Sequence, residues 1–201
     1  MTGFTVIPLL MVFCYGLTDR SGAFTLANIL AISSSEHLKA LWLSLALAGV
    51  STVICLVLAY PLALILRKRH IGKGSFVVFI FILPMWMNFL LRTMAWQTLL
   101  EKNGVINTFL TMLHLPNIAI INTPAAIILG MVYNFLPFMV LPIYNTLAKI
   151  DDNVINAARD LGADNYQTLT KILLPLSVPG IVSGITMVFV PALTTFVISN
   201  L

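Results

Sequence analysis

The feature that most limits the fold of this chain is the spacing of its charged residues. Five stretches without Lys, Arg, Asp or Glu cover residues 1–18, 40–66, 74–91, 103–148 and 172–201. A hydrocarbon core about 30 Å thick needs roughly 20 apolar residues of helix, and each stretch is near or above that length. A soluble domain carries about 25% charged residues, whereas this chain has 9%. These numbers exclude an ordinary water-soluble globule.

The uncharged stretches favour helices over a β-barrel. Barrel strands are segments of about ten residues with alternating polarity, whereas the chain has continuous apolar runs such as 42–66. A helix satisfies its own backbone hydrogen bonds in lipid. We therefore predict an all-α fold, a polytopic transmembrane helical bundle that forms one domain over 1–201. The predicted spans cover about 4–17, 41–66, 75–97, 124–147 and 172 to the end.

The distribution of basic residues predicts the orientation of these spans. Four Lys and Arg residues lie in 67–73, three lie in 149–171, and only four lie elsewhere. Short loops rich in Lys and Arg face the cytoplasm, so both segments and the N-terminus are predicted to be cytoplasmic. The net charge of +4 is explained by this bias, and we expect no nucleic-acid partner. The predicted location is the plasma or inner membrane.

The sequence carries no signal for catalysis or metal binding. A phosphate-binding GxxxxGK[ST] loop is absent, so the chain lacks the usual means of holding ATP. His37, His70 and His114 are far apart, and the two cysteines have no CxxC spacing. We predict neither an enzyme nor a bound cofactor.

The polar segment 149–171 predicts two short helices joined by a glycine turn. Asp151 and Asp152 are candidate N-caps for the first helix, and Gly162 suits the position after its end. Asp164 followed by Gln167 forms the pattern of a capping box for the second helix. A generic amphipathic linker between two spans is the alternative interpretation.

Seven positions over 156–175 resemble a family motif, namely Asn156, Ala157, Ala158, Gly162, Ile172, Leu174 and Pro175. The pattern E-A-A, three residues, G, nine residues, I-x-L-P is that of the EAA loop in permease subunits of binding-protein-dependent ABC importers. Asn156 departs from it, because the family usually has glutamate there. The resemblance implies an ATPase-coupling helix that docks into a cytoplasmic ATPase.

Further stretches look like the spermidine/putrescine branch of these permeases, namely 83–96, 122–126 and 132–142. The resemblance implies a type I permease that moves polyamines by alternating access. It implies a second homologous permease subunit, an extracytoplasmic polyamine-binding protein, and an ATPase dimer that holds ATP and Mg. This branch usually has six spans, so five present and a sixth missing at the C-terminus is the expectation. The alternatives are a permease for iron, sulfate or molybdate, or a non-functional truncated fragment.

Polar and aromatic side chains in the spans are candidates for a substrate path. Trp86 could stack on a cation, and Asn88, Tyr133 and Asn134 are further candidates, with helix packing as the alternative role. No Asp or Glu lies within a predicted span. Arg92 would repel a polyamine and is expected to reach the membrane interface.

The segment between the third and fourth spans predicts a short interfacial helix. Apolar residues recur there at helical spacing over 105–113, opposite Asn and Thr residues. Glu101 directly precedes this segment on the predicted outer face, and we hypothesise that it contacts the binding protein. In the last span, Gly180 and Gly184 form a small-residue stripe that predicts close packing against another span or a partner permease.

Overall fold

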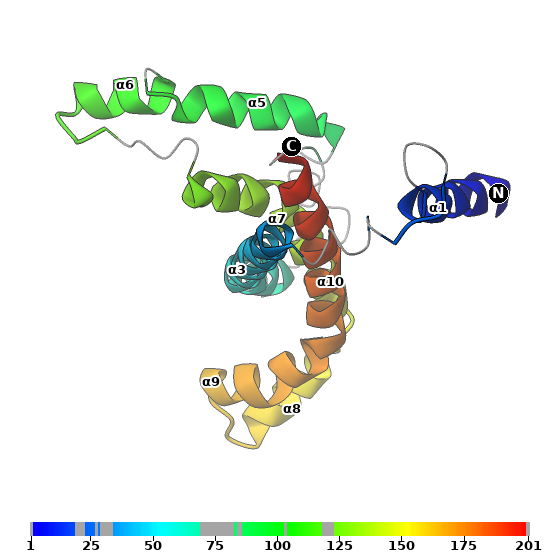
Figure 1. Ribbon diagram of the computed structural model, residues 1–201. Helices are drawn as coiled ribbons and strands as arrows, with labels where there is room; N and C mark the ends of the chain where they lie inside the picture. The colour runs from blue at the N-terminus through cyan, green and yellow to red at the C-terminus, as the bar shows by residue number, and fades with distance from the viewer. Residues whose placement is uncertain are drawn as a thin grey trace. The chain divides into compact units, whose positions relative to one another are not determined.

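The computed structural model describes residues 2–18, 23–26, 28, 34–68, 83, 86–102, 104–117 and 123–199 (Figure 1). Within these ranges the regular structure is helical, apart from one isolated antiparallel bridge between Thr18 and Phe24. The all-α prediction is confirmed for this part of the chain. Of the predicted span at 75–97, the stretch before residue 86 lies outside the described residues except for Leu83.

The chain divides into two compact units, residues 1–45 and 46–201. The first unit contains α1 (Thr2–Gly16) and the beginning of α3 (Ser35–Lys68). With 15 residues, α1 is about 22 Å long. It is apolar but shorter than the usual membrane span.

Three helices in the described ranges are long and apolar enough to cross a membrane. They are α3, α7 (Pro124–Ala148) and a continuous helix over Asn165–Thr195 that includes most of α10 (Leu174–Ser199). These helices correspond to the predicted spans at 41–66, 124–147 and 172 to the end. Thr123 is the N-cap of α7 and Pro124 its first residue, as the preference for proline at this position predicts.

The small-residue stripe of α10 packs against α7. A Cβ atom on Gly180 would lie 2.5 Å from Thr146 Oγ1 and 2.8 Å from the Pro142 carbonyl oxygen, and one on Gly184 would lie 2.7 Å from Met139 Sδ. The contacts move toward the start of α7 as α10 advances, so the two helices run antiparallel. The predicted glycine contact is confirmed, with α7 as the opposite helix.

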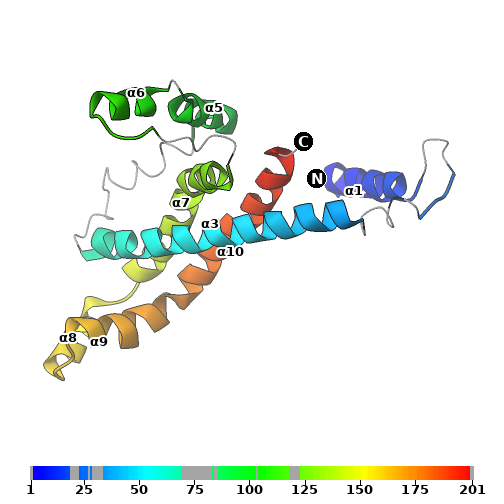
Figure 2. The same cartoon turned by 60° about the vertical axis from the view of Figure 1, so that its left-hand side comes forward.

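The part of α3 that follows residue 45 lies across α7 and α10 (Figure 2). Ser51 Oγ donates to Met131 Sδ at 3.5 Å, and Cys55 Sγ donates to the Val132 carbonyl at 3.8 Å. Small side chains allow this close approach of the helices. The fully buried core residues are Ala48, Cys55, Ala59, Ala63, Met139, Val140, Ile143, Leu147, Val188 and Ala192.

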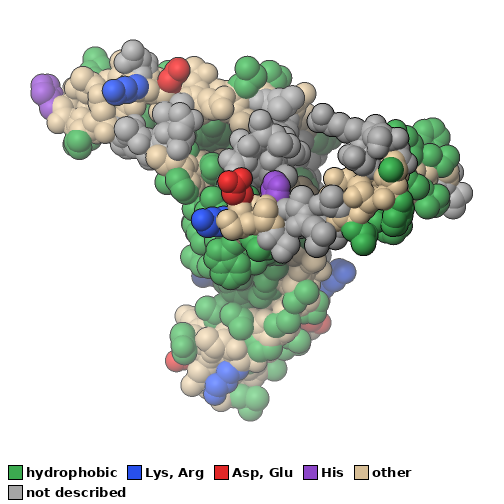
Figure 3. Space-filling view, viewed as in Figure 1, with side chains coloured by type: hydrophobic (Ala, Val, Ile, Leu, Met, Phe, Trp, Pro, Cys, Tyr) green, Lys and Arg blue, Asp and Glu red, His purple; other side chains and the backbone are tan. Residues whose placement is uncertain are grey.

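Shorter helices lie at the two ends of α7. Near its beginning are α5 (Phe89–Leu100) and α6 (Val105–Met112), and after its end follow α8 (Asp152–Asp160) and α9 (Asn165–Thr168). Figures 1 and 2 both show α8 and α9 side by side, away from α5 and α6. In the space-filling view, apolar side chains cover much of this face, and the few charged side chains include some on α8 and α9 (Figure 3).

The replacement Gly180→Ala tests the α7–α10 contact. The new methyl group would meet backbone and a branched side chain, and overpacking of this kind costs about 1–3 kcal/mol. Thermal unfolding in detergent should therefore occur at a lower temperature. Gly130→Ala on α7 is the matched control, because a Cβ there meets nothing within 4 Å. Equal stability of the two variants would contradict the close contact.

Candidate functional site

The polar segment between α7 and α10 folds as two capped helices. Asp151 is the N-cap of α8, and its carboxylate accepts a hydrogen bond from the Asn153 backbone N–H at 3.0 Å. This bond satisfies one of the free donors at the helix start. The predicted N-cap is confirmed, whereas Asp152 occupies the first helical position.

Gly162 ends α8 in the left-handed region, with φ of 85°. Its N–H donates to the Arg159 carbonyl at 2.9 Å, and the Ala163 N–H donates to the Ala158 carbonyl at 3.0 Å. This pair of bonds is the Schellman arrangement, which favours glycine because it lacks a Cβ. The predicted glycine stop is confirmed.

The second helix begins at a complete capping box. The Gln167 N–H donates to Asp164 Oδ1 at 2.6 Å, and the Asp164 N–H donates to Gln167 Oε1 at 3.3 Å. From this start α9 passes through a π-helical turn at Leu169–Leu173 into α10. In a regular α-helix the Pro175 ring would clash with the Lys171 carbonyl, and the wider turn lies at that point.

The hairpin formed by α8, Gly162 and α9 exposes most of the motif residues. Asn156, Ala157 and Gly162 are exposed, and Ala158 and Ile172 are half-buried. Leu174 and Pro175 are exposed at the start of α10. The motif residues therefore lie on α8, at the glycine turn that follows it, and in and just after the π-helical turn.

Two large side chains at the hairpin tip face outward. Leu161 is 89% exposed and Tyr166 is 73% exposed. The amphipathic pattern places Leu161 on the same apolar side as Ile155, but in the structure only Ile155 is buried. Because Leu161 follows the last helical residue, it leaves the buried face. The sequence pattern did not single out Tyr166, whose only signal is an aromatic residue two positions after the N-cap Asp164.

A guanidinium at the end of α3 holds the start of this hairpin. Arg67 Nε donates to the Leu147 carbonyl at 2.8 Å, and Arg67 Nη2 donates to the Ile150 carbonyl and to Asp152 Oδ1, both at 2.9 Å. From the sequence alone, Arg67 contributes only to the predicted orientation of the spans. Its place in the last turn of a long apolar helix is the sequence feature that could have indicated this anchoring role.

A second contact joins α3 to the other end of the hairpin. The hydroxyls of Tyr60 and Ser177 lie 3.2 Å apart, and Ser177 is fully buried. Ser177 Oγ also donates to the Leu174 carbonyl at 2.9 Å. Ser177 thus lies just after the π-helical turn and connects it to α3.

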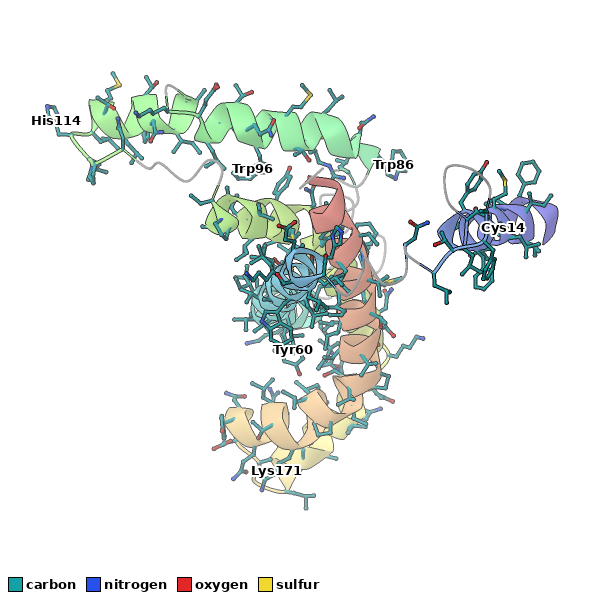
Figure 4. The ribbon with its side chains drawn as sticks, in the orientation of Figure 1. Cys14, Tyr60, Trp86, Trp96, His114 and Lys171 are labelled. Atoms are coloured by element: carbon teal, nitrogen blue, oxygen red, sulfur yellow. The ribbon has the colours of Figure 1, made fainter. Side chains whose placement is uncertain are left out.

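The substrate-path candidates divide between two places. Tyr133 on α7 meets Trp96 on α5 in an edge-to-face contact with centroids 5.2 Å apart and planes at 70° (Figure 4). Trp86 precedes α5, is 78% exposed and takes no part in this pair. Asn88 is also exposed. The structure therefore places Tyr133 beside an aromatic residue of another helix.

Arg92 on α5 and Asn134 on α7 are buried polar residues. Arg92 is 8% exposed, and its Nε and Nη1 have no hydrogen-bond partner among the described residues. The expectation that Arg92 reaches out to the interface is therefore wrong. Asn134 is 4% exposed, and its Oδ1 likewise has no partner in those residues. Buried unpaired groups are costly, which makes both residues candidates for contact with a polar solute.

The short helix predicted over 105–113 is present as α6. Its apolar side chains Val105, Phe109 and Met112 are 61–80% exposed, whereas Asn107 is buried and donates to the Glu101 carbonyl at 3.0 Å. An exposed apolar face with a satisfied polar face suits a membrane interface. Glu101 is exposed next to this helix.

Metal-ligating side chains do not gather in the described ranges as groups of three or more. His37 lies on α3 and His114 follows α6. His70 lies outside the described residues.

The geometry defines a class of protein: a helical membrane protein with a capped, exposed hairpin between two of its long apolar helices. Residues 56–201 match the model of the binding-protein-dependent transport system inner membrane component. The chain belongs to this family. It is a multi-pass permease component of an inner-membrane, binding-protein-dependent ABC importer.

Curated relatives and a solved structure agree with this membership. The chain is 36% identical to the spermidine/putrescine transport system permease protein PotB of Haemophilus influenzae, over 98% of this chain and 72% of that protein. It is 37% identical to PotB of Escherichia coli strain K12, over 98% and 75%. A bacterial ABC transporter involved in the import of the acidic polysaccharide alginate matches with a TM-score of 0.73 and 19% identity, over 90% of this chain and 65% of that chain. The last match concerns the fold alone.

Proposed function

We propose that this chain is a translocation subunit for polyamines such as spermidine and putrescine. The observation that carries the proposal is 36–37% identity, over 98% of the chain, to two spermidine/putrescine permeases. The proposed topology is a type I bundle of five spans, with the N-terminus and the hairpin in the cytoplasm. A second permease subunit completes the path, and a polyamine-binding protein delivers the solute from outside.

The α8–α9 hairpin is the proposed docking element for the ATPase. Its tip presents exposed apolar and small side chains outside the long helices, and its two ends are held by caps and by α3. A partner ATPase dimer binds ATP and Mg. Closure of that dimer displaces the hairpin, and the displacement opens the spans toward the loaded binding protein.

The proposed substrate path passes Tyr133 and Asn134. The Asn134 oxygen is a buried acceptor without a partner among the described residues, and an ammonium group is a suitable donor. Tyr133 directly precedes Asn134 and pairs with Trp96. The faces of such aromatic rings attract cations. Trp86 and Asn88 are exposed and are assigned to the mouth of the path.

Uptake of labelled spermidine tests the proposed solute. The complete transporter, reconstituted in vesicles with its ATPase and binding protein, should accumulate spermidine when ATP is supplied. Unlabelled putrescine should compete, because both are aliphatic polycations, whereas sulfate, molybdate and ferric iron should not. ATP-driven uptake of one of those three solutes instead of spermidine would contradict the assignment.

Arg92 supports a second candidate, an anionic solute. Its buried guanidinium has two unpaired donors among the described residues, and arginine binds oxyanions through paired N–H groups. A polyamine permease should keep spermidine uptake in Arg92→Gln, since a repulsive charge is removed. An anion permease should lose most of its uptake of sulfate or molybdate in the same variant.

The turn at Gly162 tests the docking element. A β-branched side chain is strained at φ of 85°, so Gly162→Val should distort the tip and abolish ATP-driven uptake. Gly162→Asn is the matched control, because asparagine tolerates this conformation; it should retain ATPase binding and uptake. Membrane insertion of both variants should match the unmodified chain in a fractionation assay. Normal transport by Gly162→Val would contradict the role of the turn.

Glu101 is proposed to contact the binding protein. The residue is exposed beside α6, and Glu101→Lys should weaken binding-protein docking through charge reversal. Lys102→Glu, at the neighbouring exposed position, controls for charge reversal nearby. Docking is measured by co-sedimentation of the binding protein with vesicles. Unchanged docking and uptake in Glu101→Lys would remove Glu101 from this interface.

A further inference from the structure

The guanidinium of Arg67, at the end of α3, donates hydrogen bonds to three acceptors around the junction of α7 and α8. Two acceptors are carbonyls, of Leu147 in the last turn of α7 and of Ile150 just beyond it. The third is the carboxylate of Asp152, the first residue of α8. The Arg67 side chain is 12% exposed, whereas that of Asp152 is 59% exposed. The largely buried Arg67 side chain therefore anchors the start of the hairpin to α3.

Arg67 interacts with the carbonyl groups at the end of one helix and with an acidic side chain at the start of the next. The last carbonyls of a helix have no partner within it and carry partial negative charge. A cation at the end of α7 is therefore favourable, and the same cation pairs with an acid in the first turn of α8. The planar, rigid guanidinium can reach several acceptors at once, which a lysine ammonium does less well.

Tyr60 makes the corresponding contact at the other end of the hairpin. It lies seven residues before Arg67, which is close to two helical turns and places both residues on one face of α3. Tyr60 meets Ser177, four residues after the π-helical turn and in the first turn of α10. One face of α3 thus contacts both the entry to α8 and the beginning of α10.

We infer that Arg67 is a positioning residue that transmits displacement of the hairpin to α3. The inference rests on the proposed docking of an ATPase at the hairpin tip. When the tip moves, the bonds of Arg67 carry α3 with the start of α8, and Tyr60 supports the same movement from the other end. Without Arg67, the tip moves independently of α3 and ATP hydrolysis is no longer matched to transport.

The test uses the assembled transporter in vesicles with Arg67→Gln. We expect solute transported per ATP hydrolysed to fall by about tenfold, equivalent to roughly 1.4 kcal/mol. Lys68→Gln is the matched control, since Lys68 is adjacent, exposed and equally charged; its ratio should be unchanged. Arg67→Lys should be intermediate. Co-purification of the ATPase should be equal in all four proteins.

A second measurement follows the movement itself, without depending on the solute. Hydrogen exchange is compared with and without a non-hydrolysable ATP analogue in the same complexes. In the unmodified protein, the analogue should change exchange in α8 and at residues 60–68 of α3. In Arg67→Gln the change should persist in α8 and disappear from α3.

The outcomes separate this inference from the proposed function. An unmodified complex with no change at α8 contradicts docking at the hairpin, and with it the role of Arg67. Changes at α8 and α3 that both persist in Arg67→Gln overturn the role of Arg67 alone. Loss of ATPase co-purification in Arg67→Gln also overturns it, because Arg67 would then shape the docking surface.

Asp152→Asn supplies an independent variant with a milder change. Because it removes one charge from the same network, it should also lower the amount of solute transported per ATP hydrolysed. The double variant should be no worse than Arg67→Gln alone, because residues of one network do not act additively. Additive losses would show that the two residues act separately and would overturn the shared network.

Discussion

The close antiparallel contact of α7 and α10 is the interaction on which the rest of the described fold depends. Gly180 and Gly184 let α10 approach the α7 backbone to distances that a side chain would prevent. Lipid offers little hydrophobic drive for helix association, so packing of small residues supplies it. Once α7 and α10 lie together, the segment between them must turn back as a hairpin, and α3 packs across both.

The hairpin is held in place by hydrogen bonds at its own ends and to its neighbours. Asp151 and Asp164 cap the starts of the two helices, and Gly162 closes the first one. Arg67 and Tyr60 then fasten the hairpin to one face of α3. In the proposed mechanism, a partner that presses on the exposed tip at Leu161 and Tyr166 displaces the hairpin, and the bonds of Arg67 pass this displacement to α3.

Local patterns predicted local structure well. Apolar length located α3, α7 and α10, and the capping residues located α8, the glycine turn and α9. Predictions failed where a side chain's surroundings came from distant segments. Arg92 is buried although its place near a span end favoured exposure. Helical periodicity describes one helix and cannot specify which neighbour covers each face.

The sequence by itself determined the all-α class, the membrane lengths of three helices, the capped hairpin and the family motif within it. These properties follow from hydropathy and from contacts between residues a few positions apart. Only the tertiary structure decided that Gly180 meets α7, that Trp96 meets Tyr133, and that Arg67 bridges α7 and α8. Each of these contacts joins segments distant in the chain, where the relevant energy depends on three-dimensional proximity and leaves no periodic signal in either segment alone.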